Sequence, residues 1–195
     1  MTFEWLSEER FPLLAGSYGF TYVHGLTPEQ LIARLGGRVE HFVPMTANEL
    51  EDQALRRFDD GGLFFGVAAV GAWTLIVETL AEIAPSEEIL LPLSAGTRLV
   101  SQYYLDVKGL DSFYWIEDGE IRFAFYAQEG YSEEVPDELA QIMRRIESDH
   151  RHAYPHEGPG FVLAEHLTGI RLTPQMVEGA TYLCGSVPQP PRTSH

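Results

Sequence analysis

The sequence predicts a single α+β domain: a largely antiparallel, twisted sheet of about six or seven strands, with helices packed mainly on one face. Three observations predict this class. Residues 98–126 alternate between apolar and polar side chains around one tight turn, residues 63–78 form a nearly continuous apolar run, and capping boxes at Thr27 and Thr46 open two helical segments. Strand and helix patterns of this kind indicate helices packed on an antiparallel sheet.

The first elements are a strand and a capped helix. Residues 20–24 are rich in aromatic and β-branched side chains, which predicts a strand. Thr27 is a good N-cap, and Gln30 three residues later completes a capping box. A helix is therefore expected from Pro28 to the glycine pair at residues 36–37.

The next part of the chain predicts a strand, a helix and two buried strands. Residues 38–43 alternate well enough for a strand that Pro44 closes. The capping box at Thr46 opens a helix that continues to Phe58. Residues 63–78 predict two mostly buried strands, which meet near a glycine and occupy a central position in the sheet.

Residues 79–94 carry two prolines, so only a short helix fits before the stretch at 98–126. That stretch predicts a three-stranded meander, whose last two strands are joined by an Asp-Gly type I′ turn at residues 118–119. The turn sets the register of the hairpin, because its central residues tolerate positive φ. The predicted pairs are Glu117 with Glu120, Ile116 with Ile121, Trp115 with Arg122, Tyr114 with Phe123, Phe113 with Ala124 and Ser112 with Phe125.

The last third of the chain is more irregular. Pro136 starts an amphipathic helix, residues 149–160 form an irregular loop, and further helical turns follow. The final residues are rich in proline and polar side chains. The prediction is one domain over residues 1–185 and a disordered tail over residues 186–195.

Charge narrows the classes of partner. The formal net charge is −16, with 29 acidic residues against 13 Lys plus Arg. A field of this sign repels phosphate backbones and anionic membrane surfaces, so nucleic acid and membrane are excluded as partners. The same field steers a basic protein or a cationic ligand inward.

The cysteine content and the N-terminus predict a cytoplasmic location. Cys184 is the only cysteine and cannot form an internal disulfide, and the first residues form neither a basic leader nor an apolar signal core. The longest uncharged run, residues 63–77, is shorter than the roughly 20 apolar residues of a membrane helix. We therefore expect no transmembrane segment.

No motif identifies a reaction. His150, His152 and His156 are candidate metal ligands, because neutral imidazole binds divalent transition metals. Their spacing is not diagnostic of a metal site, and a solvated loop with exposed histidines is the favoured alternative. Cys184 has no base partner in its local sequence. Neither of the common glycine-rich phosphate-binding motifs is present. We therefore assign no catalytic residue and no cofactor.

A candidate binding surface follows from the predicted meander. Tyr104, Phe113, Trp115 and Tyr126 are expected on its second face, with Arg122 opposite Trp115 for a cation–π contact. If this face is exposed, it is a credible protein-binding patch. Helices that cover the face are the alternative.

Short pieces spread over residues 19–178 resemble a known family. They are FTYVHGLTPE at residues 20–29 with LG at 35–36, AWTLIVE at 72–78, LSAGTR at 93–98 with DGE at 118–120, and LAEHLTGI at 163–170 with LTP at 172–174. In this order they are similar to the actinobacterial domain-of-unknown-function family numbered sixty-four sixty-one. The resemblance implies a small cytoplasmic bacterial protein, and it implies no activity, cofactor or catalytic residue.

Three functional hypotheses remain open. The first is a non-enzymatic, acidic interaction module that binds a basic protein in a bacterial regulatory, competition or defence system. The second is an enzyme or small-ligand receptor with a pocket between sheet and helices, using His24, His41 or the late histidines. The third is a structural homo-oligomer; the sequence leaves the oligomeric state undetermined.

Overall fold

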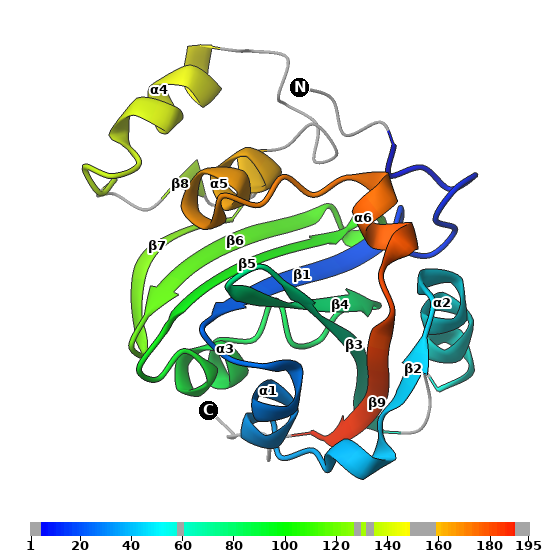
Figure 1. The fold of residues 1–195 in the computed structure, drawn as a ribbon. Coiled ribbons are helices and arrows are strands. Elements are labelled where there is room, and N and C mark those ends of the chain that lie inside the picture. The colour runs from blue at the N-terminus through cyan, green and yellow to red at the C-terminus, as the bar shows by residue number, and fades with distance from the viewer. Residues whose placement is uncertain (1–4, 58–60, 127–129, 132–134, 149–158, 190–195) are drawn as a thin grey trace.

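The computed structural model describes residues 5–57, 61–126, 130–131, 135–148 and 159–189. They form one nine-stranded antiparallel sheet in the order β2-β9-β3-β4-β1-β5-β6-β7-β8 (Figure 1). The α+β class and the antiparallel sheet are confirmed, with more strands than expected. The strands are β1 Ser17–His24, β2 Val43–Met45, β3 Gly62–Val70, β4 Trp73–Thr79, β5 Arg98–Leu105, β6 Leu110–Glu117, β7 Glu120–Tyr126, β8 Gly130–Tyr131 and β9 Tyr182–Pro188.

Helices accompany the sheet in the connections between strands. None of the described helices is long and apolar enough to cross a membrane. The α-helices are α1 Pro28–Arg34, α2 Ala47–Arg56, α3 Glu87–Leu93, α4 Ala140–Ser148, α5 Pro159–Thr168 and α6 Pro174–Gly179, and short 3₁₀ turns lie at Val39–His41 and Asp106–Lys108.

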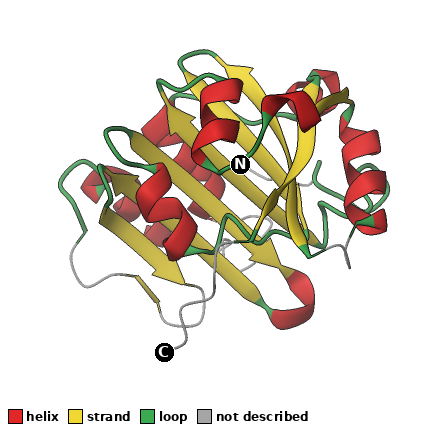
Figure 2. Cartoon of the chain, turned by 90° about the horizontal axis from the view of Figure 1, so that it is seen from below, coloured by secondary structure: helices red, strands yellow, loops and turns green. Residues whose placement is uncertain are grey.

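Both faces of the sheet are covered (Figure 2). We call the face with Phe20, Phe113 and Trp115 the aromatic face; α2, α4, α5 and α6 pack on it. The opposite, aliphatic face carries Ile76 and Leu99 and is covered by α1 and α3. The helices thus lie mainly on one face, as predicted, and the two on the other face enclose the candidate site.

The predicted capping boxes are present at both helix starts. The Thr27 backbone N–H donates to the Gln30 side chain at 3.0 Å, and the Gln30 N–H donates back to the Thr27 hydroxyl at 3.3 Å. Thr46 and Glu49 repeat this exchange at the start of α2, at 2.8 and 3.4 Å. Each box satisfies two backbone donors that a helix start would otherwise leave unpaired.

The strand predicted at residues 38–43 is wrong. A 3₁₀ turn occupies residues 39–41, and the strand β2 begins at Val43 and includes Pro44. Proline lacks an N–H and usually ends a strand, but it is tolerated at the edge of a sheet. β2 is such an edge, since it pairs only with β9.

The hairpin register is correct for its first two pairs and wrong beyond them. Asp118 and Gly119 have φ of 50° and 80°, as the predicted turn requires. A β-bulge next to Trp115 then shifts the register by one residue, so that Arg122 is extra and exposed. The pairs beyond the bulge are Trp115 with Phe123, Tyr114 with Ala124, Phe113 with Phe125 and Ser112 with Tyr126.

Burial on both faces explains the bulge. The shifted register brings Phe123 and Phe125 beside Phe113 and Trp115 on the aromatic face, where the Phe113 and Phe125 rings stack at 5.8 Å. It leaves the small Ala124 on the aliphatic face. Because both faces are buried, the polarity pattern alone did not select between the registers.

The last strand, β9, was not predicted. It inserts between β2 and β3, so residues 182–188 pair with strands that lie more than 100 residues earlier in the chain. β9 continues to Pro188, so the sheet extends three residues beyond the predicted domain boundary at residue 185. Residues 190–195 of the predicted tail lie outside the described residues.

Candidate functional site

One pocket in the described part of the chain lies on the aliphatic side, and we call it the α1–α3 pocket. It has a volume of about 490 Å³, within the range of roughly 300–1,000 Å³ typical of ligand sites. Most of its lining residues belong to α1, α3 and the outer end of β9, or follow them directly, and these elements lie near one another in Figure 1. Its lining residues are Arg34, Leu35, Leu63, Glu88, Ile89, Pro92, Leu93, Ala95, Val187 and Pro188.

Part of the pocket wall belongs to the folded core, and the rest of the lining is exposed or half-buried. Leu63, Leu93 and Val187 are each less than 5% exposed and belong to the apolar cluster under α1 and α3. Close packing of this kind holds side chains in fixed rotamers. The pocket is therefore formed before any ligand arrives.

The end of α3 makes one wall stiff. Pro92 lies in the last turn of the helix, and the Ser94 hydroxyl donates to the Leu91 carbonyl at 2.8 Å. The Ser94 hydroxyl also accepts the Gly119 N–H at 2.9 Å, and Asp118 accepts the Gly96 N–H at 2.7 Å. These bonds join the tip of the β6–β7 hairpin to the pocket wall.

Arg34 joins α1 to the end of α3. Its Nη1 donates to the carbonyls of Leu93 at 3.1 Å and Ala95 at 2.8 Å. Carbonyls at a helix C-terminus carry partial negative charge, so a guanidinium there is stabilising. Arg34 therefore holds two pocket walls together and places a cation at one end of the pocket.

Replacing Arg34 with alanine is expected to lower the free energy of unfolding by about 1 kcal/mol, because two charge-assisted bonds at a partly exposed helix end are lost. Equilibrium urea denaturation measures the change. Arg38→Ala is the matched control, since Arg38 is 70% exposed and pairs only with Glu40 among the described residues. It should change stability by less than about 0.5 kcal/mol. Equal urea midpoints for the two variants would contradict the stabilising role of the Arg34 hydrogen bonds.

Acidic side chains flank the other end of the pocket. Glu88 lines it, and Glu87 beside it accepts the Tyr126 hydroxyl at 2.9 Å. The Tyr126 hydroxyl also lies 2.9 Å from the Tyr114 hydroxyl, within hydrogen-bond distance. Glu88 lies in the first turn of α3, and Arg34 contacts the carbonyl of the last helical residue, Leu93, five residues and roughly 8 Å further along the helix axis. The pocket is apolar along its length and oppositely charged at its ends.

The predicted binding surface of Tyr104, Trp115, Arg122 and Tyr126 is not a single surface. Tyr104 and Trp115 are 3% and 2% exposed and lie in the core of the aromatic face, against the helices that cover it. Arg122 is exposed at the bulge, and Tyr126 packs against the opposite, aliphatic face. The bulge and the covering helices overturn the prediction, since together they separate side chains expected side by side.

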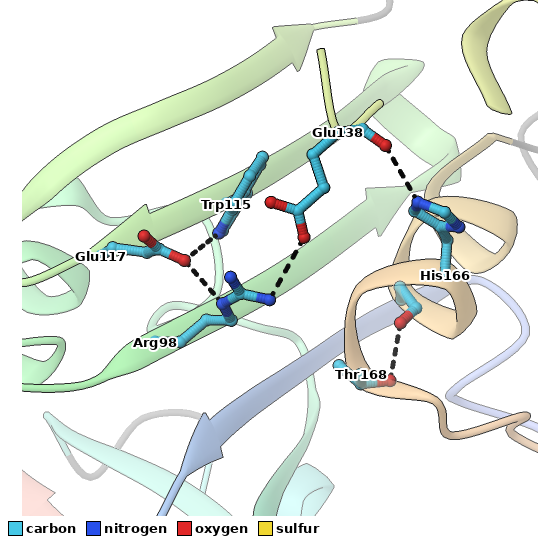
Figure 3. A network of polar contacts seen from close by, with 7 residues as sticks. Arg98, Trp115, Glu117, Glu138, His166 and Thr168 are labelled. Atoms are coloured by element: carbon cyan, nitrogen blue, oxygen red, sulfur yellow. Dashed lines mark hydrogen bonds and ion pairs between the residues drawn. The ribbon is translucent and has the colours of Figure 1, made fainter. Parts of the chain in front are cut away.

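Trp115 does meet a cation, but the cation is Arg98 (Figure 3). The Arg98 guanidinium lies 5.3 Å from the Trp115 ring centroid, and both side chains donate to Glu117, at 2.6 and 3.1 Å. Glu138 accepts from Arg98 at 3.5 Å, and its carbonyl lies 3.1 Å from the His166 ring. This network connects α5 and the turn before α4 to the sheet.

The remaining sequence candidates do not converge. His24 is exposed, with its ring 5.0 Å from Trp73, and His41 is exposed in a 3₁₀ turn; neither lines the pocket. His150, His152 and His156 lie outside the described residues. Elsewhere, the part of the chain that the structure describes contains no group of three or more His, Cys, Asp or Glu able to hold a metal ion.

Cys184 is a core residue. It is 1% exposed, and burial raises the pKa of its thiol to about 12. A thiol with this pKa stays protonated near neutral pH, and the thiolate is the reactive form. The structure therefore gives Cys184 a packing role in β9.

Sequence reasoning missed the residues that line the pocket. Arg34, Glu88 and Val187 are distant along the chain and carry no shared motif. The only available signals were local: the capping box placed α1, and the prolines limited the length of α3. Neither signal indicates that the two helices enclose a pocket.

Comparisons with known proteins give one finding. A family model described as a family of unknown function (DUF6461) matches residues 2–192. No curated protein and no solved structure matches the chain significantly.

Proposed function

Since the chain belongs to DUF6461, a family of unknown function, we propose a function from its charge and geometry. The chain is a non-enzymatic, acidic interaction module that binds a basic protein partner in a bacterial regulatory, competition or defence system. The observation that carries the proposal is the net charge of −16. A field of this strength accelerates association with cationic surfaces and disfavours anionic ones.

Most of the described acidic side chains are exposed to solvent, where a partner can approach them. Among the described residues only Glu51 and Glu78 are buried acids, and the other described carboxylates are at least partly exposed. The salt bridges seen in this part of the chain engage three arginines, Arg10, Arg38 and Arg98. Most of the described carboxylates are therefore at least partly exposed to solvent.

The α1–α3 pocket supports binding rather than chemistry. Among its described lining residues, Arg34 and Glu88 are the only charged ones, and the other eight are Leu, Ile, Val, Pro or Ala. A general acid or base with a nucleophile beside it would need further polar side chains in reach of a substrate. An apolar lining with charges at its ends suits recognition of a partly apolar, partly charged group.

Retention of a basic partner tests the proposal. The immobilised chain should retain one or more proteins of positive net charge from a native lysate of its organism. Raising the salt from about 0.1 M to about 1 M should release them, because the screening length falls from about 10 Å to about 3 Å. The dissociation constant is then measured with the purified partner.

The control is a variant with less charge and an intact fold. Glu8, Glu9, Asp52 and Glu120 are exposed, and changing all four to the corresponding amides raises the net charge from −16 to −12. This variant should associate several-fold more slowly with the same partner. The proposal fails if no basic protein is retained at low salt, or if retention does not depend on salt.

A further inference from the structure

We infer that the α1–α3 pocket anchors an apolar side chain that projects from a lysine- or arginine-rich segment of the partner. The inference rests on the proposed function and adds the site and the chemistry of the bound segment. In a complex of this type the charges steer the encounter, and one buried apolar anchor supplies much of the affinity.

The pocket has the properties of an anchor site. Its volume of about 490 Å³ exceeds what one aliphatic or aromatic side chain needs, and its floor consists of buried core residues such as Leu63 and Leu93. A pocket whose walls are already ordered requires little rearrangement on binding. Burial of a leucine side chain against such walls removes apolar surface from water and is favourable.

Charge complementarity identifies the kind of segment. Helices α1 and α3 carry Glu29, Glu87 and Glu88 against Arg34, a net charge of −2 from three acids and one base. Arg34 already directs Nη1 at two carbonyls of the α3 end, which offset part of its charge. A cation next to the apolar anchor can therefore approach Glu88, while an anion would meet the acids of both helices.

The two ends of the pocket give the bound segment a direction. Glu88 accepts hydrogen bonds from lysine or arginine, whereas the guanidinium of Arg34 donates to carbonyl oxygens. A basic side chain is placed at the Glu88 end and a backbone carbonyl at the Arg34 end, with the apolar side chain between them. A segment that lacks either the cation or the apolar side chain loses part of this fit.

Defined peptides test the inference. Fluorescence anisotropy compares three labelled probes: Lys-Lys-Leu-Lys-Lys, the same peptide with serine in place of leucine, and Glu-Glu-Leu-Glu-Glu. The leucine peptide should bind about tenfold more tightly than the serine peptide, as expected for burial of one leucine side chain. The acidic peptide should not bind measurably.

Two variants locate the binding. Ala95→Phe fills the pocket and should remove the preference for leucine over serine, while Ala69→Phe, at an exposed position of β3 outside the pocket, should keep it. Glu88→Gln should weaken both lysine peptides several-fold, and Glu9→Gln, exposed near the N-terminus, should weaken them less. If Ala95→Phe does not fold, methyl NMR of the unmodified chain provides the same test. Addition of the leucine peptide should then shift the methyl signals of Leu35 and Leu93.

The outcomes separate this inference from the proposed function. Equal binding of the leucine and serine peptides, or unchanged methyl signals, overturns the anchor site but leaves salt-dependent capture of a basic protein intact. Equal binding of the acidic and basic leucine peptides also overturns it, and indicates a receptor for uncharged apolar ligands. Failure of the proposed function shows itself separately, as the absence of any basic protein retained at low salt.

Discussion

Replacing Glu78 with alanine is expected to lower the free energy of unfolding by about 3 kcal/mol, as measured by urea denaturation at pH 6. Glu78 is the second-last residue of β4 and is 2% exposed. Its carboxyl group accepts the backbone N–H groups of Glu82 at 3.1 Å, Ile83 at 2.9 Å and Ala84 at 3.0 Å. Alanine would leave these donors without an acceptor, and each buried, unpaired donor costs about 1–3 kcal/mol.

The segment at residues 80–84, which follows β4, depends on Glu78 for most of its polar contacts with the sheet. Leu80, at its start, has φ of 55°, a left-handed conformation that costs a residue other than glycine on the order of 1 kcal/mol. Ala81 and Ala84 supply only small apolar contacts beside Tyr103, and Ile83 is the one large side chain of the segment in the core. The carboxyl group of Glu78 accepts three backbone N–H groups of the segment and is thus its main polar connection to the sheet, beside the Ser101 hydroxyl, which donates to the Ala84 carbonyl at 3.2 Å.

Glu78 also predicts how stability depends on pH. Burial raises the pKa of its carboxyl group to about 7 from an ordinary value of 4.5, although three backbone hydrogen bonds act in the opposite direction. Between these two values the folded chain holds a proton that the unfolded chain has lost. The contribution of Glu78 is therefore fully present below pH 4.5 and is lost as pH rises through 7, a change on the order of 3 kcal/mol.

The alanine variant should flatten this dependence between about pH 5 and pH 8, because the titrating group is gone. Glu82→Ala is the matched control. Glu82 is exposed and accepts a hydrogen bond from the Gln189 side chain at 2.7 Å, so its loss should change stability by less than about 0.5 kcal/mol. If the Glu78 and Glu82 variants unfold alike at every pH, Glu78 does not hold the segment.

Local chemistry accounts for what the sequence predicted well. The capping boxes at Thr27 and Thr46 and the turn at Asp118-Gly119 depend on residues within four positions of one another, so the pattern in the chain is the interaction itself. The strands β3 and β4 were predictable because a long apolar run has few alternatives to a buried hairpin. The existence of β3 and β4 therefore followed from the short-range pattern alone.

Long-range packing accounts for what the sequence did not predict. The bulge beside Trp115 depends on which aromatic side chains the helices cover, and the pocket depends on Arg34, Glu88 and Val187 meeting across the fold. Glu78 looked like one of 29 acids. It did carry a signal, as the single charge at the end of an otherwise uncharged buried strand, where an acid needs internal hydrogen-bond donors.

The second large effect is expected at Gly19, which is the partner of Glu78 across β1 and β4. A Cβ at this position would lie 2.7 Å from the Cβ atoms of both Ala81 and Ala84, and 2.8 Å from the Glu78 carboxylate. Methyl groups bonded to the backbone cannot swing aside as the end of a long side chain can. Gly19→Ala should therefore lower the free energy of unfolding by about 2 kcal/mol in urea denaturation.

A double-mutant cycle can attribute this loss to the predicted contact. Ala84→Gly removes one of the two methyl groups in the way, so the Gly19→Ala and Ala84→Gly double variant should recover at least about 0.5 kcal/mol beyond the sum of the single effects. Gly179→Ala is the control, because no atom lies within 4 Å of its added Cβ, and it should be neutral or slightly stabilising. Purely additive single effects would mean that the segment after β4 moves away from β1 instead of resisting the new methyl group. In that case the hydrogen bonds of Glu78 could not be rigid either, and the Glu78→Ala variant should lose correspondingly less than the three orphaned donors imply.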